Sequence, residues 1–167
     1  MKFLKLAVIS VLVLFALLTA LTSLLPSHVR ISRAIDIHAP VEKIVPYLSD
    51  LRKWKAWNEF VRQADPVKKG VEANASFIRT GQVEIRLIAQ PADSVLTEWK
   101  QGKGKTFRSD FALISSHSIT TTVQWYFDFH LKWYPWQKMQ SIIYDKEMGP
   151  FMETSLSNLK RIIESSQ

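Results

Sequence analysis

Hydrophobic and polar residues follow three successive patterns along the chain, and the first is an unbroken apolar run. From Leu6 to Leu25, 20 residues carry no charge, and only Ser and Thr interrupt the apolar side chains. As a helix that rises about 1.5 Å per residue, this segment would be about 30 Å long, which is the thickness of the hydrocarbon core of a bilayer. The run therefore predicts a single membrane-spanning helix.

The residues around the apolar run predict its orientation. Lys2 and Lys5 favour a cytoplasmic N-terminus, although Arg30 and Arg33 follow the run closely and oppose this orientation. A short tail before a long domain favours export of the domain. We therefore expect a single-pass membrane protein with its domain on the extracytoplasmic side.

A cleaved signal peptide is the alternative interpretation of the same run. The apolar core of a signal peptide usually has about 7 to 15 residues and ends in a small-x-small sequence. Here the run is longer, and the nearest such sequence, at residues 20–22, is a poor match. We expect residues 1–27 to form a cytoplasmic tail, an anchor and a short tether, and residues 28–167 to form one domain.

The second pattern begins the domain with one strand and two short helices. Apolar and polar side chains alternate from Ile31 to Ile37, which is typical of a strand. Helical spacing follows over residues 41–48, where Pro46 is expected to kink or shorten the helix. A second short helix is expected from Leu51 to Phe60.

The third pattern has a period of two and predicts an antiparallel sheet. One side of its strands is apolar and the other is polar, as in a sheet with one buried and one solvated face. Strands are expected at residues 75–80, 83–87, 95–100, 107–113 and 119–129, with a turn at residues 115–117.

A C-terminal helix is expected to cover the buried face of this sheet. Apolar residues recur at three- and four-residue steps from Met148 to Ile163, with charged residues off that stripe. Gly149 and Pro150 are expected to bend this helix or to set its start. An apolar sheet face needs such a cover because it has to be removed from water.

The order of strand, two short helices, antiparallel sheet and long C-terminal helix is similar to the helix-grip arrangement. Two stretches carry a closer likeness: residues 35–51, which continue into Trp54, Trp57 and Asn58, and residues 148–160, which begin Met-Gly-Pro-Phe. On these stretches the chain resembles the SRPBCC group, also called START-like or polyketide cyclase/dehydrase and lipid transport proteins, and within it bacterial members with an N-terminal membrane helix. The resemblance implies an α+β fold in which a curved antiparallel sheet wraps around a long C-terminal helix.

This resemblance implies a fold but no reaction, because the group includes lipid carriers, hormone receptors and cyclases. A curved sheet around one helix leaves a space that large side chains fill or that holds an apolar molecule. We hypothesise a ligand cavity there, with ordinary core packing as the competing interpretation for each lining residue. The candidates are Trp99, Phe107, Phe111, Trp125, Phe127, Met148, Phe151 and Met152.

A second candidate site is the aromatic cluster Trp133, Tyr134 and Trp136, between the last strand and the long helix. Trp and Tyr favour the headgroup region of a bilayer, and the flanking Lys132 and Lys138 favour anionic lipid. The cluster is a candidate membrane-surface loop at the mouth of the cavity. In the alternative interpretation, its rings pack against the helix and close the core.

Composition removes several classes of function. The chain has no cysteine, which excludes disulfide scaffolds, cysteine-ligated metals and a cysteine nucleophile. The four histidines lack metal-ligand spacing, and there is no nucleophile elbow, phosphate loop or dinucleotide fingerprint. The net charge of +7 comes from scattered basic residues, which favours anionic lipid over nucleic acid, for which no motif is present. We expect no catalytic residue, metal, cofactor or nucleic-acid partner.

The leading hypothesis is therefore binding of a hydrophobic small molecule or lipid by a membrane-tethered domain, with transport or sensing as its purpose. The bilayer is the expected partner. A non-catalytic interaction or envelope-stress module with a filled core is the first alternative. A cyclase- or hydrolase-like enzyme is the second, and it would need titratable side chains that point into the cavity.

Overall fold

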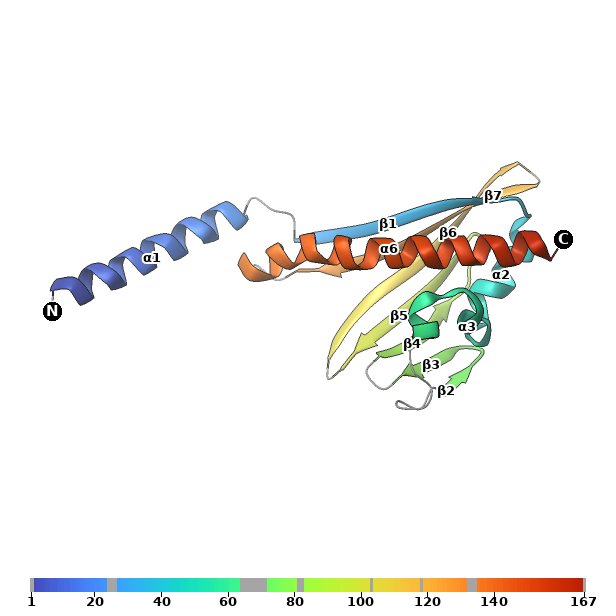
Figure 1. Ribbon diagram of the computed structural model, residues 1–167, viewed down its shortest axis with the longest axis horizontal. Helices are drawn as coiled ribbons and strands as arrows, with labels where there is room; N and C mark the ends of the chain where they lie inside the picture. Colours follow the sequence, from blue (N-terminus) through green and yellow to red (C-terminus); the bar gives the residue numbers. More distant parts are fainter. Residues whose placement is uncertain are drawn as a thin grey trace.

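The computed structural model describes residues 2–23, 27–63, 72–80, 83–102, 104–117, 119–131 and 135–166. One long apolar helix precedes an α+β domain (Figure 1). In chain order the elements are α1 (Lys2–Ser23), β1 (His28–Ile37), α2 (Val41–Ser49), the 3-10 turn η1 (Leu51–Lys53), α3 (Trp54–Trp57), α4 (Glu59–Gln63), β2 (Glu72–Asn74), β3 (Phe77–Thr80), β4 (Val83–Ala89), β5 (Ser94–Gln101), β6 (Lys105–His117), β7 (Thr120–His130) and α6 (Pro135–Ser165).

The seven strands form one antiparallel sheet in the order β1-β7-β6-β5-β4-β3-β2. The sheet curves around α6, which lies lengthwise against β1, and α2, α3 and α4 close the remaining side (Figure 1). This arrangement confirms the expected α+β helix-grip fold. The first strand and the last strand are neighbours because β1 pairs with β7 along its whole length, from His28 opposite His130 to Ile37 opposite Thr121.

Alternation along each strand decides which side chains meet α6, as the pattern of period two predicts. On β5 the side chains of Val95, Thr97 and Trp99 are buried, whereas Leu96 and Glu98 between them are only half-buried. Across the sheet, Phe111 of β6 lies opposite Trp125 of β7. The apolar face is therefore built from residues that neighbouring strands place side by side.

Helix α6 is longer than the sequence pattern indicates. It begins at Pro135 and runs for 31 residues through Gly149 and Pro150, so the expectation that this pair sets the helix start is wrong. Pro150 removes one backbone donor, a loss that the rest of a long helix tolerates. Gly149 allows the guanidinium of Arg33 to approach the helix backbone, since a Cβ at this position would overlap with it.

The boundaries of several helices and strands also differ from those expected from the sequence. The helix expected over residues 51–60 is divided into η1, α3 and α4. Asp50 caps η1 by accepting a 3.1 Å bond from the Arg52 amide, and Asn58 ends α3 and caps the start of α4. Residues 75–76 form a turn between β2 and β3 instead of starting a strand. Strand β6 continues to His117, past the expected turn, and Ile119 is 58% exposed instead of joining the buried face.

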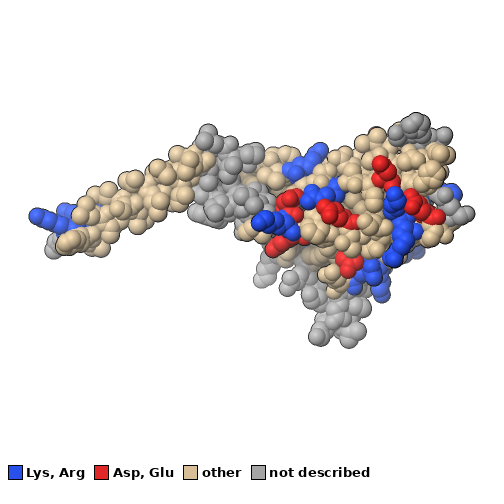
Figure 2. Space-filling model, turned by 45° about the horizontal axis from the view of Figure 1, so that its top comes forward, with Lys and Arg blue, Asp and Glu red and all other residues tan. Residues whose placement is uncertain are grey.

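Helix α1 lies outside the hydrophobic core. It extends away from the domain, and every buried apolar side chain of the described residues lies between Ile31 and Ile163 (Figure 1). Figure 2 shows basic side chains at its N-terminal end and a long uncharged surface beyond them, whereas both signs of charge mix on the domain. By length and composition α1 is a candidate membrane span or signal sequence.

Candidate ligand-binding site

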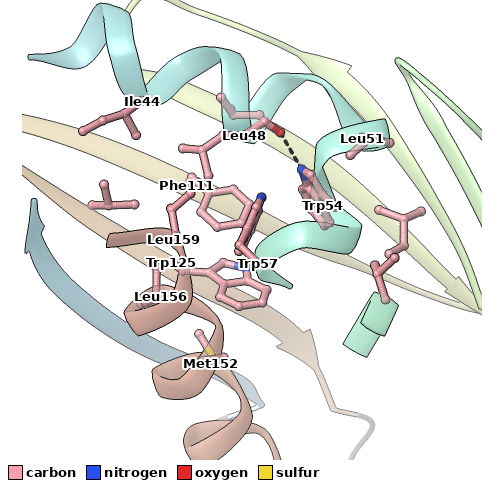
Figure 3. Close-up of a cluster of buried hydrophobic side chains, with 14 of the residues drawn as sticks. Ile44, Leu48, Leu51, Trp54, Trp57, Phe111, Trp125, Met152, Leu156 and Leu159 are labelled. Carbon is pink, nitrogen blue, oxygen red and sulfur yellow. Dashed lines mark hydrogen bonds between the residues drawn. The ribbon is translucent and has the colours of Figure 1, made fainter. Parts of the chain in front are cut away.

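The interior of the domain has two regions, which differ in how well their side chains are covered. The first, called here the distal core, lies where α3 and the end of α2 pack against the sheet. It is built around Trp54, Trp57, Phe111 and Trp125, all of which have 0% exposure. Figure 3 shows the tryptophans of α3 pointing toward Phe111, with apolar side chains of α2 and α6 around them.

Aromatic rings fill this distal core in direct contact. Phe111 and Trp125 stack with ring centroids 5.0 Å apart, and Trp57 meets Phe111 edge-on at 5.9 Å. Trp54 lies 5.2 Å from Trp57. Such offset and edge-on pairs add about 0.5–1.5 kcal/mol each to the burial of their area. The distal core is therefore a packed, stabilising region.

The indole N–H groups of the buried tryptophans all have protein acceptors. Trp54 and Trp57 donate to the carbonyls of Leu48 and Tyr47 at 2.9 and 3.1 Å. On the sheet, Trp125 donates to Ser109 Oγ at 2.6 Å and Trp99 to Thr97 Oγ1 at 3.2 Å. Because these donors are satisfied within the protein, they hold the α3 segment and the strands in place and do not offer a ligand a hydrogen bond.

The second region, called here the proximal rim, consists of half-buried apolar side chains from the start of β1, the start of β6, the end of β7, α4 and α6. Val29, the second residue of β1, lies opposite Phe129 of β7. Phe129 stacks on Tyr144 of α6 at 4.9 Å and contacts Phe107 at 5.3 Å. The rim comprises Val29, Phe60, Phe107, Phe129, Tyr144, Met148 and Phe151.

A charged clamp holds α6 at the boundary between the two regions. The Nε of Arg33 donates to Glu153 Oε1 at 2.7 Å, and its Nη2 donates to Asp145 Oδ1 at 3.2 Å. These acidic residues lie on either side of Gly149, where the guanidinium meets the helix backbone. The clamp ties α6 to β1 on both sides of Pro150, so the part of α6 that covers the rim is fixed in register.

Two acidic residues with shifted pKa values, Asp110 and Asp128, lie on the outer face of the sheet. Arg30 donates to both carboxylate oxygens of Asp128 at 2.7 and 2.8 Å, and these bonds lower the pKa of Asp128. Burial raises the pKa of Asp110, which is 6% exposed and lies between the inward-facing Ser109 and Phe111. Among the described residues, Asp110 is the only buried charged side chain, and no cluster of three or more His, Asp or Glu could hold a metal.

With this geometry in place, the chain can be compared with known proteins. A family model described as polyketide cyclase / dehydrase and lipid transport matches residues 28–164. The chain belongs to this family. The likeness to the SRPBCC or START-like group, expected from the sequence, is thereby confirmed, while none of the curated proteins compared matches the chain.

Solved structures show the family fold at low identity. A START superfamily protein from Mycobacterium smegmatis has a TM-score of 0.60 and 16% identity, over 83% of this chain and 99% of that protein. DynU16, from the dynemicin biosynthetic locus, has a TM-score of 0.55 and 16% identity over 85% of this chain, which spans only 49% of DynU16. Norcoclaurine synthase from Thalictrum flavum, solved with dopamine and hydroxybenzaldehyde, has a TM-score of 0.56 and 8% identity over 84% of this chain and 88% of the synthase.

The family and the fold are those of ligand-binding or cyclase-like domains. Within this domain, the eight residues expected to line a cavity fall into two groups. Five of them are buried and belong to the continuous core: Trp99, Phe111, Trp125, Phe127 and Met152. The other three are half-buried and belong to the proximal rim: Phe107, Met148 and Phe151. The structure thus brings all eight candidates to the inner side of the sheet or to α6, but only three of them reach the rim.

Four rim residues were not among the sequence candidates. Val29 and Phe129 follow the strand alternation, and this pattern could have identified them. Tyr144 lies four residues before Met148, so an extension of the apolar stripe toward the N-terminus of α6 could have identified it. Phe60 follows the break at Asn58, and no simple signal marks it. In the candidate membrane loop, Trp133 and Tyr134 lie outside the described residues; Trp136 belongs to α6, but its side chain is also outside them.

Proposed function

We propose that this family domain is tethered to a membrane and binds an apolar small molecule or lipid at its proximal rim. The observation that carries the proposal is the half-buried apolar surface formed by Phe107, Phe129, Tyr144 and Met148 at the end of the domain next to α1. Neighbouring apolar side chains that the fold leaves partly uncovered are typical of surfaces that bind another molecule.

The short connection to α1 supports access from the bilayer. Helix α1 ends at Ser23 and β1 begins at His28. The five residue-to-residue steps from Ser23 to His28, at about 3.6 Å each, span at most about 18 Å. If α1 crosses the membrane, the rim at Val29 stays close to the lipid surface, and an apolar molecule could pass between bilayer and rim with little exposure to water.

The proposed topology follows from the charges at the N-terminus. Lys2 and Lys5 favour a cytoplasmic N-terminus, so residues 1–27 would act as tail, anchor and tether, and residues 28–167 would form an extracytoplasmic domain. The resemblance to bacterial members with a membrane helix supports a bacterial inner membrane as the location. The aromatic segment of Trp133, Tyr134 and Trp136 would contact lipid headgroups.

The driving force for binding would be burial of apolar surface. Removing about 300 Å² of apolar area from water contributes about 7 kcal/mol at 25 cal/mol per Å². Part of this gain is offset by lost translational and rotational freedom. Because the gain and this cost are of similar size, binding is expected to be reversible, which suits transfer or sensing better than permanent storage.

The proposal is tested with the full chain in lipid nanodiscs by native mass spectrometry, followed by extraction of bound molecules. Met148→Lys places a charge in the rim, whereas Ile143→Lys changes an exposed residue of the same helix, 52% accessible. The wild type and Ile143→Lys should retain an apolar molecule, and Met148→Lys should lose it. Equal retention in all three, or an empty wild type in repeated preparations, would contradict the proposal.

A second candidate function is a non-catalytic interaction or envelope-stress module, and the packed distal core favours it. An empty wild type that also shows no thermal shift with a panel of lipids would support this candidate. An enzyme of the cyclase or hydrolase kind has less support, because the described part of the chain buries no titratable side chain on the inner face of the sheet.

A further inference from the structure

The side chain of Asn58 contains a buried hydrogen-bond donor that the fold does not use. Asn58 has 0% exposure, and its Oδ1 accepts the amide N–H of Val61 at 3.3 Å, which caps the start of α4. Its Nδ2 has no protein partner among the described residues. Most buried donors in native proteins are paired, so an unpaired one calls for an explanation.

Polar groups next to Asn58 form hydrogen bonds with α6. Ser155 Oγ of α6 accepts the amide N–H of Glu59 at 2.9 Å, and the amide of Asn158 donates to the carbonyl of Trp57 at 3.5 Å. These bonds join the α3–α4 junction to one face of α6. The cap needs only the oxygen of Asn58, and the nitrogen remains available at this seam.

The seam leads from Asn58 to the proximal rim. Phe151 lies one helical turn before Ser155 on the same face of α6, and its ring is 5.9 Å from that of Phe60, two residues after Asn58. Both phenylalanines are half-buried. A molecule held at the rim against these rings would therefore lie next to the α3–α4 junction that contains Asn58.

We propose that Asn58 Nδ2 donates a hydrogen bond to a neutral oxygen of the bound molecule. This inference rests on the proposed function and narrows its ligand to an apolar molecule with a carbonyl, ester or hydroxyl group. A hydrocarbon would leave the donor unpaired. A carboxylate or phosphate inside the rim would also be costly, because no basic side chain is buried among the described residues.

Asn58→Ser provides a selective test, because serine is as good a helix N-cap as asparagine but its short side chain cannot place a donor where Nδ2 lies. Two probes of equal size are used: 2-acetylnaphthalene, which has one acceptor oxygen, and 2-ethylnaphthalene, which has none. Their dissociation constants are measured by tryptophan fluorescence quenching with the full chain in nanodiscs. Partitioning into lipid is the same for both proteins and cancels when the variant is compared with the wild type.

The variant should bind the ketone about 5- to 10-fold more weakly than the wild type and bind the hydrocarbon equally well. Equal weakening of both probes, or no change for either probe, would overturn the role of Asn58 while leaving binding at the rim intact. If the amide donates to a bound water instead of the ligand, neither probe should bind more weakly to the variant. If neither probe quenches the wild type, both the inference and the proposed function fail. Asn58→Asp, which also keeps the cap oxygen, should weaken ketone binding at least as much.

Discussion

The distal core and the proximal rim are built from the same kinds of residue but differ in closure. In the distal core, Trp57 and Trp125 are fully covered and their indole donors are paired within the protein. At the rim, Phe129 and Tyr144 stack on one another but remain half-buried. Complete burial with satisfied polar groups stabilises the fold, whereas incomplete burial leaves apolar surface for another molecule. The comparison separates the residues that hold this domain together from those that are available for binding.

The largest expected effect is a difference between two phenylalanines of the same strand. Phe111 of β6 is fully buried in the distal core, and Phe107 of the same strand belongs to the rim. Phe111→Ala should lower the free energy of unfolding by about 3–5 kcal/mol, because it creates a cavity in packed surroundings. Phe107→Ala should cost about half as much.

Urea unfolding of residues 27–167, which contain the whole described core, measures both losses. Phe111→Leu serves as the control, because it keeps most of the volume and should lose less than Phe111→Ala. Equal losses for the two alanine variants would show that the rim is as tightly packed as the core, and the distinction between the regions would fail.

An intermediate effect on stability is expected at the boundary between the two regions, where the guanidinium of Arg33 lies against Gly149 of α6. In a chain with Arg33→Met, Gly149→Ala should stabilise α6 by about 0.5–1 kcal/mol, the usual gain of alanine over glycine in a helix. In the wild type the same change should be neutral or destabilising, because the new Cβ displaces the guanidinium from the helix.

A double-mutant cycle measured by thermal unfolding gives the coupling between the two positions, and about 1 kcal/mol is expected. Asp145→Asn and Glu153→Gln provide a check, since removing the partners of Arg33 should reduce this coupling. Additive effects would mean that the clamp does not fix α6 above the rim.

The smallest expected effect concerns the ion pair on the outer side of the proximal end. Because the bonds from Arg30 lower the pKa of Asp128, the charged carboxylate is favoured in the folded state. The stability that this pair contributes is present above the ordinary aspartate pKa of about 4 and is lost as the pH falls through the lower folded pKa. Asp128→Asn should therefore cost less than about 1 kcal/mol at pH 7, because the site is partly exposed, and this cost should shrink as the pH falls below the ordinary aspartate pKa.

Asp110→Asn, on the same face of the sheet, should change the stability of the domain in the opposite direction. Burial raises the pKa of Asp110, so its charged form destabilises the folded state above that pKa. The amide should stabilise the domain at pH 7, and this gain should disappear as the pH falls below about 4, where the carboxyl is protonated in both states. Unfolding curves between pH 3 and 7 measure both variants, and a change of the same sign in both would contradict these assignments.

Sequence patterns were sufficient for the architecture because alternation and helical spacing report which side of an element is buried. They placed Phe111, Trp125 and Met152 on the inner side, where the structure has them. They did not show depth, because the same alternation describes Phe127, which is buried, and Phe129, which is half-buried. Depth depends on contacts between distant segments, such as that of Phe129 with Tyr144 of α6.

Two features could not be predicted because they depend on single long-range contacts. Gly149 and Pro150 suggest a helix boundary, and only the approach of Arg33 from β1 explains why α6 continues through them. Asn58 is part of a family-like stretch, but its unpaired nitrogen becomes visible only when α4 and α6 are placed together. In both cases the local sequence suggests a helix boundary, and contacts with a distant segment determine the structure that forms there.

The most direct test of the account is photo-crosslinking of the full chain in nanodiscs that contain a neutral lipid with a diazirine in its acyl chain, followed by mass spectrometric mapping of the labelled residues. The account predicts labelling of rim residues Phe107, Phe129, Tyr144 and Met148 in addition to α1, with Phe111 and Trp125 unlabelled. Labelling restricted to α1 would contradict the claim that the proximal rim receives an apolar molecule from the bilayer.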